Sequence, residues 1–200
     1  MGKKIGILCI LLGILCLAAS AGLILFNRME AAAAETASGA MLEIVRQQVP
    51  DRPSQPVPVL ATSQQTPREM PAVELDGYPC IGILSIPVLE LELPVLENWD
   101  YEKLRKAPCS YHGSVYGPDF VIAAHNYPAH FGNLHQLLEG DLILFTDLTG
   151  QTHIYQVVLV ETLPPTATAE MITSGFDLSL YTCTPGGGSR VTARCSRVNP

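Results

Sequence analysis

Apolar positions gather first in one long run near the N-terminus. Residues 5–26 are almost entirely apolar, and Ser20 is the only clearly polar side chain among them. A helix of this length spans roughly 30 Å, which is enough to cross the hydrocarbon core of a bilayer. Lys3 and Lys4 precede the run, and basic residues favour the cytoplasmic side. The pattern predicts a cytoplasmic tip and a membrane anchor in residues 1–28, with the rest of the chain outside the cell.

A cleaved signal peptide is the competing interpretation of this segment, because the small residues 31–34 follow the run. The apolar part of a signal peptide normally has about 7–15 residues, and this run is longer. We therefore favour an anchor that stays attached, which predicts a single-pass protein of the cell membrane with an extracytoplasmic domain.

Between the anchor and the folded domain the pattern changes twice. Residues 29–49 are rich in Ala and Glu and are expected to continue as a helix. Seven of the sixteen prolines fall in residues 50–79, among Ser, Gln and Thr. Such a composition does not bury a core and is typical of an extended, semi-rigid spacer. We assign residues 29–78 to a helical and Pro-rich spacer, and residues 79–200 to the folded domain.

Short apolar and alternating runs then recur along the folded domain. Residues 89–93 alternate Leu with Glu, as the two faces of a half-buried strand do. Strands are predicted over residues 81–86, 88–93, 119–124, 142–145, 154–160, 178–183 and 189–198, with short helical turns at 101–105 and 133–138. Seven or eight short strands at this spacing predict a mainly β fold, a closed or nearly closed barrel.

Charge and cysteine content narrow the functional class. The chain carries a formal net charge of −7, and its basic residues are scattered. Nucleic-acid-binding proteins generally show a basic stripe or a basic balance, so we predict no nucleic-acid partner. Of the six cysteines, Cys9 and Cys16 lie in the apolar run, and no C-x-x-C pair occurs. A disulfide among Cys80, Cys109 and Cys195 and buried free thiols both stay open as interpretations.

Cys183 is the candidate nucleophile. It ends the predicted strand 178–183 and is followed at once by a Gly-rich turn, so its thiol is expected to be partly exposed. Arg190 opens the next strand, and a tight hairpin brings it back beside Cys183. A guanidinium there stabilises a thiolate, binds substrate or holds a developing oxyanion. His125 follows the buried strand 119–124 and is the candidate general acid.

Each of these residues has an ordinary interpretation when it is taken alone. A cysteine at a strand end is more often structural, and a histidine in a loop or an arginine at a strand start is more often a surface residue. Arg194 is the rival for the arginine role, because it lies on the same face of its strand as Arg190 but farther from Cys183. The prediction of a catalytic site rests on the three residue types occurring in this order and context.

In that combination the sequence resembles the sortase family. The segment LSLYTC, which ends at Cys183, resembles the T-L-x-T-C signature, with Ser179 in place of the usual first Thr. The segment IAAHN resembles the A-G-H-[TRN] segment around His125, with Ala124 where Gly is commoner. Arg190 matches the arginine that opens the following strand of the family.

The resemblance extends over most of the predicted domain. IGILSIPVLELELPV, residues 81–95, resembles the first two barrel strands of the family. HFGNLHQLLEGDLILF, residues 130–145, resembles the helix and strand that follow the histidine. In all, the resemblance covers residues 81–198 and implies a closed eight-stranded β-barrel.

The resemblance also implies a reaction, that of a cysteine transpeptidase of Gram-positive bacteria without cofactor or metal. The Cys183 thiolate would attack the Thr–Gly carbonyl of an LPXTG-like sorting signal and form a thioacyl enzyme. His125 would protonate the departing amine and then deprotonate the incoming one, while Arg190 would hold the substrate and the oxyanion. Thr182, beside the sulfur, and Asn126 are the implied substrate-binding residues.

The implied partners are sorting signals of secreted surface proteins or pilins, an amine of a cell-wall peptide or pilin lysine, and the bilayer through residues 5–26. Surface anchoring and pilus polymerisation use the same three residues, so the sequence does not assign the class. Two alternatives stay open. One is a cysteine protease that passes the acyl group to water, and the other is a non-catalytic anchored barrel that serves as a binding or assembly module.

Metal sites are not predicted. His125, His130 and His135 recur every five residues, a spacing that does not place them on one helix face, and Pro128 interrupts any helix there. No recognisable loop of calcium ligands occurs either. Solvated, surface or capping roles are expected for the remaining charged or imidazole candidates, Glu90, Glu92, Asp141, Asp147, His112 and His153.

Overall fold

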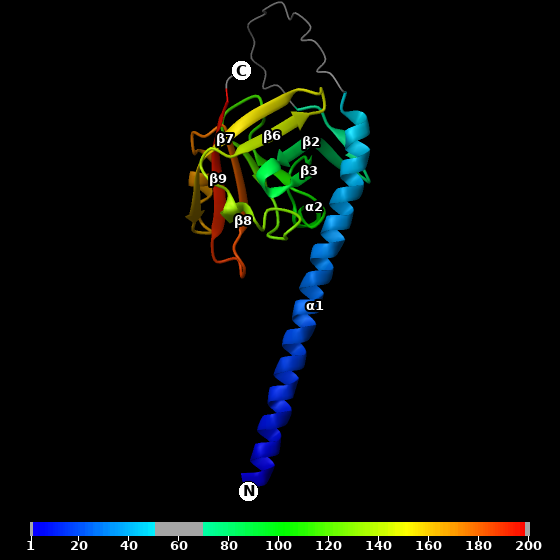
Figure 1. Cartoon of the computed structure of the whole chain (residues 1–200), viewed down its shortest axis with the longest axis vertical. Coiled ribbons are helices and arrows are strands. Elements are labelled where there is room, and N and C mark those ends of the chain that lie inside the picture. The colour runs from blue at the N-terminus through cyan, green and yellow to red at the C-terminus, as the bar shows by residue number, and fades with distance from the viewer. Residues whose placement is uncertain (1, 51–69, 199–200) are drawn as a thin grey trace, which may run out of the picture.

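A long helix carries a β-barrel at its C-terminal end in the computed structural model, which describes residues 2–50 and 70–198 (Figure 1). The helix, α1 (Gly2–Gln48), runs without interruption from the apolar segment into contact with the barrel. Its N-terminal part is long and apolar enough to cross a membrane. Of the spacer expected at residues 29–78, residues 51–69 lie outside the described residues.

Nine described strands form one sheet, and eight of them close the barrel. The strands are β1 (Val73–Leu75), β2 (Tyr78–Ile86), β3 (Leu91–Leu96), β4 (Cys109–His112), β5 (Phe120–Ala123), β6 (Leu142–Asp147), β7 (Thr152–Leu163), β8 (Leu178–Cys183) and β9 (Arg190–Arg197). They follow the order β2-β3-β4-β5-β8-β9-β7-β6, and pairing of β6 with β2 completes the ring. The β3–β4 and β5–β8 pairs are parallel, and the other pairs in the ring are antiparallel. The predicted eight-stranded barrel is confirmed, and β1 adds a short strand beside β2 outside the ring.

Short helical segments connect the strands. They are η1 (Pro87–Leu89), α2 (Tyr101–Leu104), η2 (Leu134–Gln136) and α3 (Thr168–Ile172), so both predicted helical turns are present. The strand predicted over residues 88–93 begins only at Leu91, because η1 occupies its start and Glu90 has a left-handed φ of 54°. Pro87 favours this turn, since proline fixes φ near its helical value and fits the first helical position. The sheet itself begins at Val73, ahead of residue 79.

The barrel interior is filled by alternate residues of the strands. Along β7, His153, Tyr155 and Val157 are buried while their neighbours are exposed, the period of two expected for a strand with one covered face. Tyr155 and the phenylalanines Phe120 and Phe145 are fully buried. These large side chains leave no open channel through the barrel, so a site for a ligand has to lie at its ends or on its outer face.

The last third of α1 docks on the outside of the barrel. Ala34, Ser38, Met41 and Val45 are buried at spacings of four, three and four residues, which is one face of a helix. Met41 and Val45 share a buried cluster with residues of β1, β2, β3, β4 and β5. The opposite end of α1, by contrast, exposes its large apolar side chains, from Ile5 to Met29. One helix is therefore both the apolar span and part of the folded domain.

All six cysteines are free thiols. Cys80 and Cys109 flank Leu96 on the two neighbouring strands, so they lie two strand spacings apart, roughly 10 Å, which is too far for a disulfide. Cys195 is buried in the other cluster, inside the barrel. Burial raises the pKa of Cys80 to about 11 and the pKa of both Cys109 and Cys195 to about 12. All three thiols lie in buried apolar clusters, where they pack the domain.

Candidate functional site

Cys183 and Arg190 face each other across one hairpin. They are the last residue of β8 and the first residue of β9, and they are register partners. The turn between them is closed by the Thr184 amide on the Ser189 carbonyl (3.0 Å) and by the Ser189 amide on the Thr184 hydroxyl (3.0 Å). Gly186 adopts a left-handed φ of 81°, which a residue with a β-carbon rarely does. The predicted hairpin is present, and it leaves the Cys183 side chain half-buried.

The guanidinium of Arg190 is held by the turn. Its Nη1 donates to the carbonyls of Gly187 (3.0 Å) and Ser189 (3.1 Å). Arg190 lines a small hollow with Tyr111 and Tyr181, whose rings meet edge to face at 5.3 Å. Within the described residues it forms no ion pair with a carboxylate. No described carboxylate therefore neutralises its positive charge.

Thr182 connects the two chain segments of the site. Its buried hydroxyl donates to the Ala124 carbonyl (2.8 Å), and the Ala124 amide donates to the Tyr181 carbonyl (3.2 Å). These bonds continue the parallel β5–β8 pairing for one residue beyond the end of β5. They bring the residue before His125 next to the residue before Cys183.

His125 lies in the loop after β5. Its ring is half-buried and packs against the ring of Tyr127, with the centroids 4.9 Å apart. Burial lowers the pKa of His125 from its usual value; the carboxylate of Glu30 opposes that shift, and Arg105 adds to it. The neutral imidazole is therefore the prevailing form at neutral pH. His130, from the same loop, is fully buried, and burial lowers its pKa to about 4.

Two adjoining cavities collect most of the predicted residues. Cys183, Thr182 and Asn126 line one of about 230 Å³, together with Pro185. His125 lines a larger one of about 600 Å³, and Asn126 and Pro185 line both, so the two are neighbours. The structure thus gathers Cys183, Thr182, Asn126 and His125 at one end of the barrel. Arg190 adjoins them through its strand pairing but lines a separate hollow.

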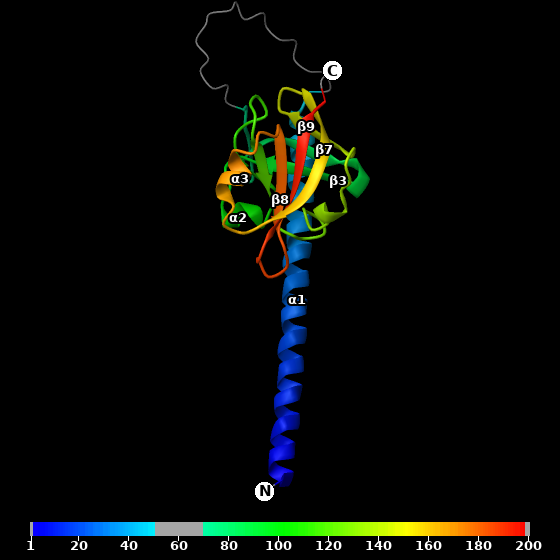
Figure 2. The same ribbon diagram turned by 90° about the vertical axis from the view of Figure 1, so that its left-hand side faces the viewer.

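The larger cavity has a wall that the sequence did not indicate. Ile24, Asn27, Arg28, Glu30 and Ala31 of α1 form this wall, opposite the His125 loop. The hairpin between β8 and β9 extends from the barrel toward the N-terminal part of α1 (Figure 2). The signal for this arrangement was the Ala- and Glu-rich continuation of the apolar run as a helix. It did not show which side of that helix meets the barrel.

Arg194 is not available for the arginine role. Its side chain is buried, and its Nε donates to the Glu161 carboxylate at 2.7 Å. Its terminal nitrogens donate to the Ser179 hydroxyl at 2.9 Å and to the Glu170 carbonyl at 2.8 Å. Ser179, the departure from the usual signature, thus helps to hold a buried arginine in place.

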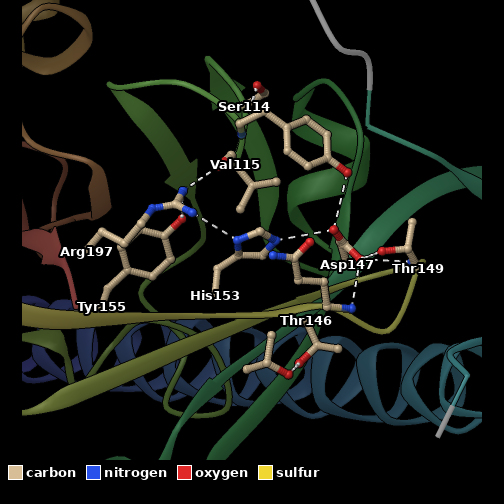
Figure 3. Close-up of polar contacts among 11 residues, drawn as sticks. Ser114, Val115, Thr146, Asp147, Thr149, His153, Tyr155 and Arg197 are labelled. Atoms are coloured by element: carbon tan, nitrogen blue, oxygen red, sulfur yellow. Dashed lines mark hydrogen bonds and ion pairs between the residues drawn. The ribbon is translucent and has the colours of Figure 1, made fainter. Parts of the chain in front are cut away.

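A second polar cluster lies near the other end of the barrel, where Asp147, His153 and Arg197 meet (Figure 3). His153 Nε2 lies 3.2 Å from the Asp147 carboxylate, and the Arg197 guanidinium lies 3.0 Å from His153 Nδ1. The expectation of surface or solvated roles for His153 and Asp147 is wrong, because both face the barrel interior. Arg197 occupies the ring nitrogen that a nucleophile would need, so this pair does not form a hydrolytic site. It joins β6, β7 and β9 instead.

Asp147 also fixes the turn between β6 and β7. It accepts hydrogen bonds from the amides of Thr149 (2.9 Å) and Gln151 (3.1 Å). Burial by itself would raise the pKa of Asp147, but hydrogen bonds from Thr149 and His153 outweigh it and lower the pKa. Glu92, another expected solvated charge, is exposed and pairs with Arg46 of α1 at 2.5 Å. No described group of three or more His, Cys, Asp or Glu side chains is arranged to hold a metal ion.

Comparisons with known proteins show the family and the fold of this chain. The family model of the sortase domain matches residues 84–198. Sortase C1 of Streptococcus suis is similar in structure, with a TM-score of 0.55 and 27% identity over 60% of this chain and 74% of that chain. Sortase C of Streptococcus pneumoniae gives a TM-score of 0.54 and 26% identity over 60% and 70%. Sortase C-1 of Actinomyces oris gives 0.52 and 28% over 60% and 73%. A comparison with curated proteins finds no match.

Proposed function

Because this chain belongs to the sortase family, we propose that it is a cysteine transpeptidase that cleaves a sorting signal and joins the product to an amine. Cys183 is the nucleophile, His125 is the general acid and base, and Arg190 binds the substrate and the oxyanion. The observation that carries this proposal is the meeting of two chain segments. The hairpin that pairs Cys183 with Arg190 adjoins the loop of His125 through one hydrogen bond of Thr182.

The chemistry proceeds in two halves. His125 takes the proton of the Cys183 thiol, and the resulting thiolate adds to the carbonyl carbon of the scissile peptide bond. The C–N bond breaks as His125 gives that proton to the leaving amine. A thioester between Cys183 and the substrate remains. The lowered pKa of His125 leaves a neutral imidazole, which then removes a proton from the incoming amine. That amine displaces the thiolate and forms the new amide.

Arg190 supports both halves with its charge. Its guanidinium is not neutralised by a described carboxylate, and it lies across the hairpin from the sulfur. To bind the oxyanion it exchanges the carbonyls of Gly187 and Ser189 for the substrate oxygen. An oxyanion is the stronger acceptor, because a hydrogen bond to a charged oxygen is about twice as strong as one to a neutral oxygen.

The substrates proposed are LPXTG-like sorting signals of surface proteins or pilins, cut between Thr and Gly. The structure from Streptococcus pneumoniae was described in terms of pilin substrate specificity, and one from Clostridium perfringens contains a C-terminal cell wall sorting motif. The amine comes from a cell-wall peptide or a pilin lysine. Substrates of this kind are held at the cell surface, where an anchored enzyme meets them.

We place residues 5–26 of α1 in the bilayer, with the N-terminus in the cytoplasm and the barrel outside. The exposed apolar side chains between Ile5 and Met29 support this placement, because lipid would cover them. The end of the barrel that carries Cys183 then faces the membrane, since the β8–β9 hairpin extends toward the N-terminal part of α1 (Figure 2).

The test uses the full-length chain in detergent micelles and a quenched fluorescent LPXTG-like peptide, with and without triglycine. We expect cleavage and a triglycine adduct from the wild type and from Cys16→Ala, which removes an exposed thiol of the anchor. Cys183→Ala is expected to abolish both products. Cleavage without the adduct would indicate a cysteine protease. Absence of cleavage of a panel of sorting peptides, with no labelling of Cys183 by a thiol reagent, would favour a binding or assembly module.

A further inference from the structure

The larger cavity of the site is lined by two parts of the chain, the loop after β5 and the helix α1. Its floor is the loop of His125, Asn126, Tyr127 and Pro128, and its opposite wall is the α1 segment just beyond the apolar run. The cavity holds about 600 Å³ and adjoins the smaller one that contains Cys183. This cavity gives an incoming reactant access to a thioester on Cys183 from the side of His125.

The charged residues on its wall define which reactant fits. Glu30 and Arg28 are the two charged side chains among the residues that line it. Glu30 is half-buried, whereas Arg28 is exposed. Glu30 is also close enough to His125 for its carboxylate to oppose the lowering of the pKa of that imidazole. The negative charge is therefore on the inner side of the cavity, next to the group that handles protons.

We propose that this cavity is the acceptor subsite, in which the carboxylate of Glu30 binds the ammonium group of the amine acceptor beside His125. The inference rests on the proposed function and adds to it a site and a residue from the anchor helix. A carboxylate lining a partly enclosed cavity is a natural partner for a primary ammonium, which offers three donors. The rest of the lining, from Ile24, Ala31, Tyr127 and Pro128, suits the aliphatic stem of such an amine.

The acceptor loses two protons and gains one bond at this site. One proton goes to solvent as the bound ammonium becomes the free amine. The amine nitrogen adds to the thioester carbon, His125 takes the second proton, and the C–S bond breaks with the electron pair returning to Cys183 as thiolate. The products are the amide, a protonated His125 and the Cys183 thiolate, so charge and atoms balance.

The helix offers a matched control for Glu30. Glu35 lies on the same helix and carries the same charge, but it is exposed and lines a different hollow, with Ser38 and Glu90. Glu30→Gln and Glu35→Gln remove the same charge from α1 at two positions. Glu30→Asp keeps the carboxylate with a shorter side chain.

The experiment measures the ratio of adduct to hydrolysis product in the full-length chain in detergent micelles, as triglycine is varied. For Glu30→Gln we expect the adduct-to-hydrolysis ratio at low triglycine to fall at least about tenfold, which is the loss of one hydrogen bond to a charged group. Glu35→Gln should behave as the wild type, and Glu30→Asp should recover part of the ratio. With hydroxylamine, which is uncharged at neutral pH, the ratio for Glu30→Gln should change much less.

Three outcomes overturn the proposal. An unchanged ratio for Glu30→Gln shows that the carboxylate does not bind the acceptor. A fall in both adduct and hydrolysis product at an unchanged ratio shows that the carboxylate acts only through His125 or the fold. An equal fall with hydroxylamine shows that the charge of the nucleophile is not recognised. If the wild type does not cleave the peptide, the proposed function fails first, and the acceptor subsite falls with it.

Discussion

The Thr182 hydroxyl donates a 2.8 Å hydrogen bond to the carbonyl of Ala124. This bond joins the residue before Cys183 to the residue before His125, so one side chain sets the spacing between the two proposed reacting groups. The hydroxyl is buried, and the β5–β8 pairing holds the backbone on both sides of it.

Thr182→Val is expected to weaken both the fold and the reaction. Valine has nearly the same shape but leaves a buried carbonyl unpaired, which lowers the free energy of unfolding by about 1–3 kcal/mol. The rate of peptide cleavage should fall as well, because the hydrogen bond that fixes the loop of His125 relative to Cys183 is lost. Urea unfolding followed by tyrosine fluorescence and the cleavage assay measure the two effects. Thr182→Ser keeps the hydroxyl, and equal behaviour of the two variants would contradict this role.

Arg190→Ala should reduce peptide cleavage about 10²–10³-fold, the usual effect of removing one donor to an oxyanion. Arg190→Lys keeps the charge without the planar fork and should recover only part of the rate. Both are measured as kcat/KM with the sorting peptide. Arg46→Ala is the control, because Arg46 forms an exposed ion pair with Glu92 on the outside of the barrel. A wild-type rate for Arg190→Ala would remove Arg190 from the mechanism.

Two neighbouring charges should shift the pKa of His125 in opposite directions. The groups around it are Glu30, Arg105, Tyr127 and the buried His130. Glu30→Gln removes a negative charge and should lower the pKa of His125 further, whereas Arg105→Gln removes a positive charge and should raise it. The rate that needs protonated His125 is then lost at lower pH in the first variant and at higher pH in the second.

This prediction is checked by NMR titration of the His125 imidazole or by the pH profile of peptide cleavage. A shift in the same direction for both variants would show that structural change, and not charge, moves the pKa. Lys106→Gln removes a positive charge that lies over the ring of Tyr78 and not at His125, so it serves as the control.

His130 should make the fold sensitive to acid. Its pKa is lowered by burial to about 4, so the folded state resists protonation that the unfolded chain accepts near its usual value of about 6.5. The contribution is fully present above the usual pKa and is lost as the pH falls toward the folded value, by up to ~3 kcal/mol. Urea unfolding at several pH values between these limits should show the loss. His130→Leu should flatten this part of the profile.

His112→Leu is the matched control for that experiment, because the side chain of His112 is exposed. It should leave the pH profile of stability as in the wild type. An equally steep profile in His130→Leu would assign the acid sensitivity to other groups.

The barrel strands were predictable where an apolar run ends at a turn. Strand β8 begins and ends at the predicted residues, since its run is bounded by Cys183 and the Gly-rich turn. Strand β3 starts later than predicted, because alternation of Leu with Glu is also compatible with a turn led by Pro87. The sequence did not predict strand β4. Its four residues show no marked alternation of apolar and polar side chains, and their pairing with β3 and β5 places them in the sheet.

The sequence predicted the proposed reacting groups of the candidate site and two of its neighbours, Thr182 and Asn126, but not the wall formed by α1. Cys183, Arg190 and His125 stand at strand ends, a position that the local sequence reveals. The sequence does not predict the place of Glu30 in the cavity, because that place depends on how α1 docks on the barrel. Docking is decided by contacts between segments far apart in the chain. The prediction of a surface or capping role for His153 was wrong. The period of two along β7 places His153 on the same inward face as Tyr155.

The unbroken course of α1 has a consequence for substrate selection. With residues 5–26 spanning the bilayer as proposed, the segment from Ile24 to Ala31 that meets His125 lies at the level of the lipid headgroups. A rigid helix, docked through Met41 and Val45, does not let the barrel rise or tilt freely. The barrel would then act at a fixed height above the bilayer, and it would favour substrates whose sorting motif lies close to the membrane surface.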